Sequence, residues 1–397
     1  MEDPSKDEVP RVLKVLQALK QASHDLQTRP GHNSDKSNSP AIKALLELET
    51  ESDTILSNDP KLSTLSHHLT ELKKLVESLQ ETRGHGLRSF LTRRVSTHSI
   101  SRLAGSIKSE IQAWIDRESV ENLARALREP LINEDELVEL LIQLEERVSQ
   151  GFNRELQDLV LKFKVFSLLE SILCDPKCSK RVREHSAFAI AALIRFNKDV
   201  FVGQVLMGPT IRALIAMGSP HSIQVLCSLI RSIRSPLVDE IESNGEIPKI
   251  IGLLNCQELE MRVLAMDCVL EIGYYGRKEA VEAMLKEGLL KKLMDLQRSE
   301  LGGNLIDLGE HNEKEEKGVS VGGVEGKRES HQTKFSNSHP FASCVARFAV
   351  QLEVGEGLRQ RERRAFKQEI LVRVREASLS DAEAATVVAE VLWGSSP

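Results

Sequence analysis

Apolar residues recur at helical spacing along most of the chain, and the pattern is strongest between residues 163 and 296. There, one unit comes round four times: a tight start, an apolar helix and then a second apolar helix. The units start at Phe163, Gly208, Gly245 and Gly288, which lie 45, 37 and 43 residues apart. A unit of this length cannot bury its own apolar face, so successive units must stack. The pattern therefore predicts an α-solenoid.

The N-terminal part predicts helices that lie outside the repeats. An amphipathic helix over 8–28 is followed by a polar linker, rich in helix breakers, over 29–40. Three further apolar-periodic segments, 41–56, 62–79 and 100–127, follow. Helices with facing apolar stripes pack together. We therefore expect an N-terminal helix over 1–28 and a helical bundle over 41–128.

The pattern divides the remainder of the chain into three parts. The repeats are expected over 129–297, and their first helix joins them to the bundle. Residues 298–340 are polar and rich in glycine, which predicts a disordered insertion between the second and third helices of a repeat. Helical periodicity returns over 341–397, where we expect a third helix over 341–352 and two capping helices. The last of these follows a capping box formed by Ser380 and Glu383.

Composition and charge narrow the class of protein. Apolar residues make up 41% and aromatic residues 4% of the 397 residues, which suits packed helices and predicts an all-α fold. The net charge of −6 leads us to expect no nucleic-acid partner. Six scattered cysteines, with no apolar signal segment after Met1, favour a reducing compartment, the cytosol or the nucleus. No uncharged apolar run reaches the roughly 18 residues of a membrane span.

Two stretches of the repeats carry a recognisable motif: one begins Val182-Arg-Glu, and the other is Gly245-Glu-Ile-Pro-Lys-Ile-Ile-Gly-Leu-Leu, followed by Glu260-Met-Arg-Val. Both resemble armadillo repeats, so we expect armadillo-like repeats over 129–297. The resemblance covers roughly residues 150–297 and a helix pair near 341–393, and repeats of the HEAT type are the alternative. A bundle in front of armadillo repeats is similar to the plant U-box/armadillo ligases. The chain has no Cys-Pro dipeptide of the kind that starts a U-box, so the resemblance implies a relative without that module.

The armadillo resemblance also implies a candidate binding groove. Armadillo proteins that clamp peptides carry Trp and, four residues later, Asn on the third helix. The matching places here hold Phe188 with Ala192 and Asp267 with Glu271, so the Asn ladder is missing. Two carboxylates four residues apart share a helix face and would attract a basic segment, while Phe188 would hold an apolar anchor. The alternative is that both acids are solvated surface.

A basic segment between the third and fourth predicted helices is a second candidate. From residue 83 to 108 it contains six basic residues and no acid: Arg83, Arg88, Arg93, Arg94, Arg102 and Lys108. Ser96 follows an Arg pair and is a candidate phosphorylation site. Two interpretations remain open: a docking patch for acidic protein, phosphate or anionic lipid, and a solvated connection between helices.

The sequence predicts no catalytic set, cofactor or metal site. Cys174-Asp-Pro-Lys-Cys178 lacks a second Cys or His pair, and Gly355-Glu-Gly357 lacks the strand and further residues of a phosphate loop. His67, His68 and His185 have no nucleophile or acid in a recognisable order. We therefore expect a non-enzymatic scaffold or adaptor that binds a protein partner. The alternatives are an adaptor working with ubiquitin ligases and a peripheral membrane binder.

Overall fold

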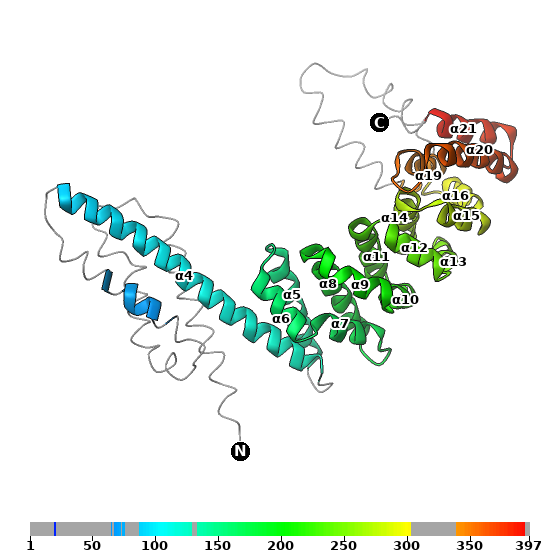
Figure 1. The fold of residues 1–397 in the computed structure, drawn as a ribbon. Helices are drawn as coiled ribbons and strands as arrows, with labels where there is room; N and C mark the ends of the chain where they lie inside the picture. The colour runs from blue at the N-terminus through cyan, green and yellow to red at the C-terminus, as the bar shows by residue number, and fades with distance from the viewer. Residues whose placement is uncertain are drawn as a thin grey trace, which may run out of the picture. The chain divides into compact units, whose positions relative to one another are not determined.

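The computed structural model describes residue 20, residues 65–75 except 66 and 73, and residues 87–128, 133–302 and 339–393; for 87–98 and 100 it describes the backbone only. The described parts are helices joined by turns, with no strand among them (Figure 1). The chain forms two compact units. The first takes residues 1–128 and 153–165, and the second takes 129–152 and 166–397.

The first unit is dominated by helix α4, Leu87–Ala126 (Figure 1). Its 40 residues extend over about 60 Å. The predicted start near Ile100 is wrong, because no glycine or proline after Gly86 interrupts the backbone before that point. As a result the greater part of the basic segment is helical rather than a connection between helices.

The described part of the first unit buries several of the residues predicted for its core. Leu65, Leu69 and Leu72 of the segment predicted as a helix over 62–79 are helical and buried, and so are Ile107 and Ile111 of α4. Helix α6, Arg154–Lys162, contacts α4 within this unit. The predicted helices over 8–28 and 41–56 and the linker over 29–40 lie outside the described residues, apart from the helical residue 20.

The second unit is a series of three-helix repeats (Figure 1). It begins with α5, whose N-terminus is capped by Asn133, the acceptor for the Asp135 N–H at 3.3 Å. The helices are α5 (Glu134–Ser149), α7 (Val165–Cys174), α8 (Lys180–Phe196), α9 (Lys198–Met207), α10 (Thr210–Met217), α11 (Pro220–Ile233), α12 (Ser235–Ser243), α13 (Ile247–Leu253), α14 (Leu259–Tyr275), α15 (Lys278–Lys286), α16 (Leu289–Arg298) and α19 (Cys344–Val354).

The four predicted repeat starts each precede the second helix of a repeat, namely α7, α10, α13 and α16. Gly245 and Gly288 have φ of +68° and +75°, a left-handed conformation that glycine adopts without a steric penalty. Each complete repeat has three helices rather than two, which is the armadillo and not the HEAT arrangement. The predicted all-α solenoid is therefore confirmed.

Consecutive third helices pack against one another: α5 on α8, α8 on α11, α11 on α14 and α14 on α19 (Figure 1). Leu254, Val269 and Leu293, which we expect in the core, are at most 1% exposed. Because a single repeat exposes its apolar face, this stacking supplies the core that each repeat lacks.

The predicted insertion leaves and re-enters the fold at one point. The Phe341 N–H donates to the Leu301 carbonyl at 3.2 Å, so the two ends of the segment meet. Helix α19 contacts α14 and α16, as expected for the third helix of the last repeat. Residues 303–338 lie outside the described residues, so disorder in the insertion stays a prediction.

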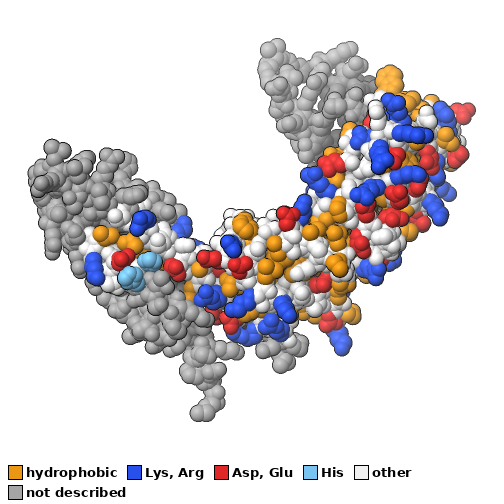
Figure 2. Space-filling model, viewed as in Figure 1, with side chains coloured by type: hydrophobic (Ala, Val, Ile, Leu, Met, Phe, Trp, Pro, Cys, Tyr) orange, Lys and Arg blue, Asp and Glu red, His pale blue; other side chains and the backbone are white. Residues whose placement is uncertain are grey.

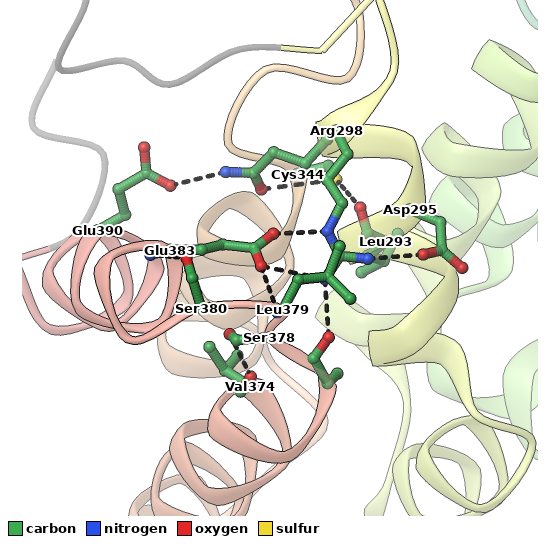
Figure 3. A network of polar contacts seen from close by, with 12 residues as sticks. Leu293, Asp295, Arg298, Cys344, Val374, Ser378, Leu379, Ser380, Glu383 and Glu390 are labelled. Atoms are coloured by element: carbon green, nitrogen blue, oxygen red, sulfur yellow. Dashed lines mark hydrogen bonds and ion pairs between the residues drawn. The ribbon is translucent and has the colours of Figure 1, made fainter.

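Helices α20 (Gln360–Ala377) and α21 (Asp381–Trp393) form the C-terminal cap, which polar contacts fasten to α16 (Figure 3). The Arg298 guanidinium donates to the Glu383 carboxylate at 2.6 Å and to the Ala377 carbonyl at 2.7 Å. Ser380 accepts from the Glu383 N–H as predicted, but the Glu383 carboxylate accepts from the Leu379 N–H instead of closing the capping box on Ser380. The Glu383 carboxylate thus connects Arg298 of α16 to the turn between α20 and α21.

A buried polar cluster adds a second connection between the cap and the last repeat (Figure 3). The Glu390 carboxylate accepts from Gln297 at 3.1 Å and from the Ser343 hydroxyl at 2.8 Å. The Cys344 thiol donates to the Leu293 carbonyl at 3.0 Å. Burial raises the pKa of Cys344 to about 12, so this group stays a neutral thiol at physiological pH.

The burial of Leu293 yields a stability prediction. Leu293→Ala removes a fully buried side chain and should lower the free energy of unfolding by about 2–5 kcal/mol, measured by chemical denaturation. The matched control is Leu259→Ala, because Leu259 is 40% exposed and its replacement should change stability by about 0.5 kcal/mol or less. Equal losses in the two variants would contradict the assigned packing.

The Arg298–Glu383 pair yields a pH prediction. Hydrogen bonds from the Arg298 guanidinium hold the pKa of Glu383 below its usual value. A carboxyl with a lowered folded-state pKa stabilises the fold above its unfolded pKa of about 4.3, and this contribution is lost as pH falls through the folded-state value. The melting-temperature difference between the native chain and Glu383→Gln should therefore shrink between about pH 5 and pH 3. A melting-temperature difference that stays constant over this pH range would show that the ionised pair does not stabilise the fold.

Candidate functional site

The third helices present one continuous surface, which we call the third-helix face: the half-exposed and exposed residues of α5, α8, α11, α14 and α19. Side chains of neighbouring third helices meet at separations of 33 to 40 residues along the chain. For example, His221 of α11 contacts Glu184 of α8 at 3.1 Å. Repeats in a constant register bring equivalent side chains into one row.

Charged side chains on this face pair across successive helices. Arg195 of α8 lies 3.8 Å from Glu145 of α5 and donates to Ser228 of α11 at 3.1 Å. Arg231 of α11 lies 3.1 Å from Glu271 of α14. The half-exposed position of these pairs keeps their contribution to stability small and leaves their charged groups open to competition.

The predicted acidic pair, Asp267 and Glu271, lies on the third-helix face and is half-buried. Burial raises the pKa of both carboxyl groups, and nearby guanidinium groups act in the opposite direction. Arg347 and Arg231 act on Asp267, while Arg231 acts on Glu271. The negative charge expected from the sequence is therefore compensated by two arginines on neighbouring third helices.

The predicted apolar part of the groove is only partly accessible. Phe188 is half-buried and lies edge-on to the His221 ring, with 5.6 Å between ring centroids. Ala192 is 2% exposed, which corrects its assignment to the groove: α8 packs between α5 and α11, and this part of the helix is buried by that contact. Burial lowers the pKa of His185, which favours its neutral form.

The C-terminal ends of α11 and α14 carry a cluster that the sequence did not reveal. We call Arg231, Arg234, Tyr274 and Tyr275 the Tyr-Arg rim. The two tyrosine rings meet edge-on with 4.7 Å between centroids, and both arginine side chains are 57% exposed. Arg234 has a φ of +70°, an uncommon conformation for a residue with a side chain.

The turn Gly355-Glu-Gly357, which follows α19, holds the rim in place through the backbone of Tyr274. The N–H groups of Glu356 and Gly357 donate to the Tyr274 carbonyl at 2.8 and 3.2 Å, and the Glu356 carboxylate lies 3.2 Å from Arg234. A Cβ atom on Gly357 would lie 2.0 Å from the carbonyl oxygen of Gly276. Gly355-Glu-Gly357, excluded above as a phosphate loop, is thus a close-packed turn that holds the rim in place.

The predicted basic segment is only partly described. Arg83 lies outside the described residues, and Arg88, Arg93, Arg94 and Ser96 belong to the part of α4 described as backbone alone. Arg102 is exposed and Lys108 half-buried. Nothing in the structure tests the docking or phosphorylation roles, which stay predictions.

The other candidates from the sequence form no site within the described residues. No group of three or more His, Cys, Asp or Glu side chains there is arranged to hold a metal ion. Cys178 contacts Asp175, and burial raises the pKa of both Cys174 and Cys178. No single described helix is long and apolar enough to cross a membrane, although α9 and α10, bent by 68°, together have the length and composition.

Comparisons with known proteins identify no family. No family model matches the chain, and no curated protein does. Similar solved structures include a designed armadillo repeat protein in complex with the peptide (KR)4, which is 16% identical over 70% of this chain and 98% of its own, with a TM-score of 0.40. Another designed armadillo repeat protein is 15% identical over 68% of this chain and 99% of its own, with a TM-score of 0.39. Likenesses this weak carry no argument about function.

The turn against the rim yields a prediction with a matched control. Gly357→Ala places a methyl group against backbone and should lower the free energy of unfolding by about 1–3 kcal/mol. Gly252→Ala meets nothing within 4 Å in α13 and should raise it by about 0.5–1 kcal/mol, because alanine loses less entropy in a helix. Chemical denaturation of the two variants checks both signs, and a stabilised Gly357→Ala variant would contradict the described turn.

Proposed function

We propose that this chain is a non-enzymatic scaffold that binds an extended segment of a protein partner along the third-helix face, centred on the Tyr-Arg rim. The rim carries this proposal: two tyrosines and two arginines are partly exposed together, and hydrogen bonds from Ser235 and from the turn at Glu356 and Gly357 fix the backbone of both tyrosines. Tyrosine and arginine are enriched among the residues that dominate binding energy at protein interfaces.

The backbone of Arg234 supports the same proposal. A residue with a side chain at a φ of +70° costs folding free energy, and such costs are concentrated at sites where function requires a set geometry. Here the conformation joins α11 directly to α12 and leaves the guanidinium at the surface beside Glu356. Since the contact with Glu356 is exposed, an anionic group of a partner can replace it.

The charges on the face define the partner segment. A basic partner side chain would compete with Arg231 for Glu271, and an apolar side chain would pack on the Tyr274–Tyr275 pair. This retains the basic and apolar character expected from the sequence. The two compensating arginines add a requirement for an acceptor, a backbone carbonyl or a carboxylate, to meet the guanidinium groups.

Two expectations from the sequence stay predictions. A role beside ubiquitin ligases rests on the resemblance to plant U-box/armadillo proteins alone. Placement in the cytosol or nucleus rests on the scattered cysteines, and all six are free thiols in the structure.

A photo-crosslinking experiment tests the proposed face. A benzophenone amino acid replacing Tyr274 should link the full chain to a partner segment in cell extract, whereas the same group replacing the exposed Lys291 of α16 should not. The linked segment, made as a peptide, should bind Tyr274→Ala/Tyr275→Ala about tenfold or more weakly than the native chain, because hot-spot side chains contribute at least 1–2 kcal/mol. Identical crosslinks from both positions, or unchanged affinity, would contradict the proposal.

The charge of the bound segment is tested on the acidic pair. Asp267→Lys/Glu271→Lys reverses two charges beside Arg231 and Arg347, so a basic segment should bind more weakly, and the difference should shrink between low and about 0.2 M salt. Peptide affinity measured by fluorescence anisotropy gives the comparison, with circular dichroism to establish that the variant folds. Unchanged affinity in a folded variant would remove these carboxylates from the binding surface.

A further inference from the structure

The basic side chains on the inner side of the cap helix α20 have ion-pair or hydrogen-bond partners, and those on its outer side have none in the described part of the chain. The inward-turned basic residues are all engaged: Arg363 donates to the Leu358 and Gly355 carbonyls, Lys367 pairs with Glu353, and Arg373 pairs with Glu369. Three further arginines, Arg361, Arg364 and Arg375, are exposed and have neither an ion pair nor a hydrogen bond to their side chains in the described part of the chain. The unsatisfied cations thus all lie on one side of the helix.

Two of these cations, Arg361 and Arg375, stand at the ends of a straight stripe. Its five exposed positions are spaced four, three, four and three residues apart, and we call them the outer stripe: Arg361, Ala365, Gln368, Val372 and Arg375. This is the spacing by which one helix presents a seam to another. Arg364 and Glu376 are exposed beside the stripe. The arginines at its two ends are about 21 Å apart, and Val372, which is 50% exposed, lies between them.

Helix α21 carries exposed apolar side chains at the level of the N-terminal part of α20. It contacts α20 and follows it after a short turn at Ser378–Ser380, so the two helices run antiparallel (Figure 1). Trp393, which is 83% exposed, lies as many residues after the turn as Ala365 lies before it. Since the two helices are antiparallel, Trp393 is level with the N-terminal part of α20. Figure 2 shows basic, hydrophobic and acidic side chains together on the surface of these C-terminal helices.

Neither helix stability nor the repeat fold explains this composition. The helix dipole disfavours a cation such as Arg361 in the first turn of α20. The outward surface of a terminal repeat faces water and is ordinarily polar, yet here it exposes Trp393 and Leu392.

We propose that the outer stripe of α20 docks an acidic amphipathic helix of a protein partner. Arg361 and Arg375 would each receive a carboxylate in the bidentate geometry that the guanidinium group favours, and the apolar residues of the partner helix would cover Val372 and Ala365. The stripe is one helix wide, which fits a rod-shaped partner. An anionic membrane fits less well, because a flat surface would also face the exposed Asp381 at the start of α21.

A display experiment on the full chain tests this surface. A library of helical peptides of about 20 residues, randomised on one face, is selected for binding to the full chain. Enriched peptides should carry Asp or Glu near both ends of that face, bind more weakly as salt rises, and bind R361E/R375E about tenfold or more weakly. The control K177E/K198E makes the same change in net charge at two exposed lysines of the first repeats and should bind as the native chain does.

The outcomes separate the alternatives. Y274A/Y275A, which tests the Tyr-Arg rim, should leave these peptides bound. The proposal is overturned if no peptide is enriched, or if enriched peptides bind R361E/R375E as tightly as the native chain. It is also overturned if the stripe contacts lipid instead: the native chain then sediments with vesicles of phosphatidylserine and phosphatidylcholine, R361E/R375E does not, and the acidic peptides fail to compete. Thermal melting by circular dichroism establishes that each variant is folded.

Discussion

The packing of each third helix on the next is the interaction on which the second unit depends. A single repeat has a core too small to be stable alone, and the contacts of α8, α11, α14 and α19 with their neighbours add the apolar burial that it lacks. The same contacts set a nearly constant register between repeats. Because the register is constant, residues that are 33 to 40 positions apart in the sequence become neighbours on one face.

That constraint explains why the candidate site lies where it does. The buried sides of the third helices are occupied by packing, and Ala192 shows that even a position matched to a known groove can be lost to it. The ends of the helices are less covered by this packing. At the ends of α11 and α14 a strained residue, Arg234, and a turn from the last repeat hold the Tyr-Arg rim in a set geometry, so partner binding there requires little reordering.

The sequence predicts the elements that depend on local signals and misses those that depend on distant contacts. Glycine starts and apolar period predict the repeats, because each repeat encodes its own helices. The early start of α4 is missed, since no local signal distinguishes a polar helix from a polar connection. The rim is missed because the Gly357 N–H donates to the Tyr274 carbonyl across 83 residues of sequence, and no local sequence signal near either residue predicts that contact.

The most direct test of the central claim, that the third-helix face around the Tyr-Arg rim is the binding surface, is hydrogen–deuterium exchange of the full chain with and without a captured partner segment. The account predicts slower exchange on binding in the segment that joins α11 to α12 around Arg234, and in the turn Gly355-Glu-Gly357. Slower exchange confined to the first and second helices of the repeats, with the rim unchanged, would contradict it.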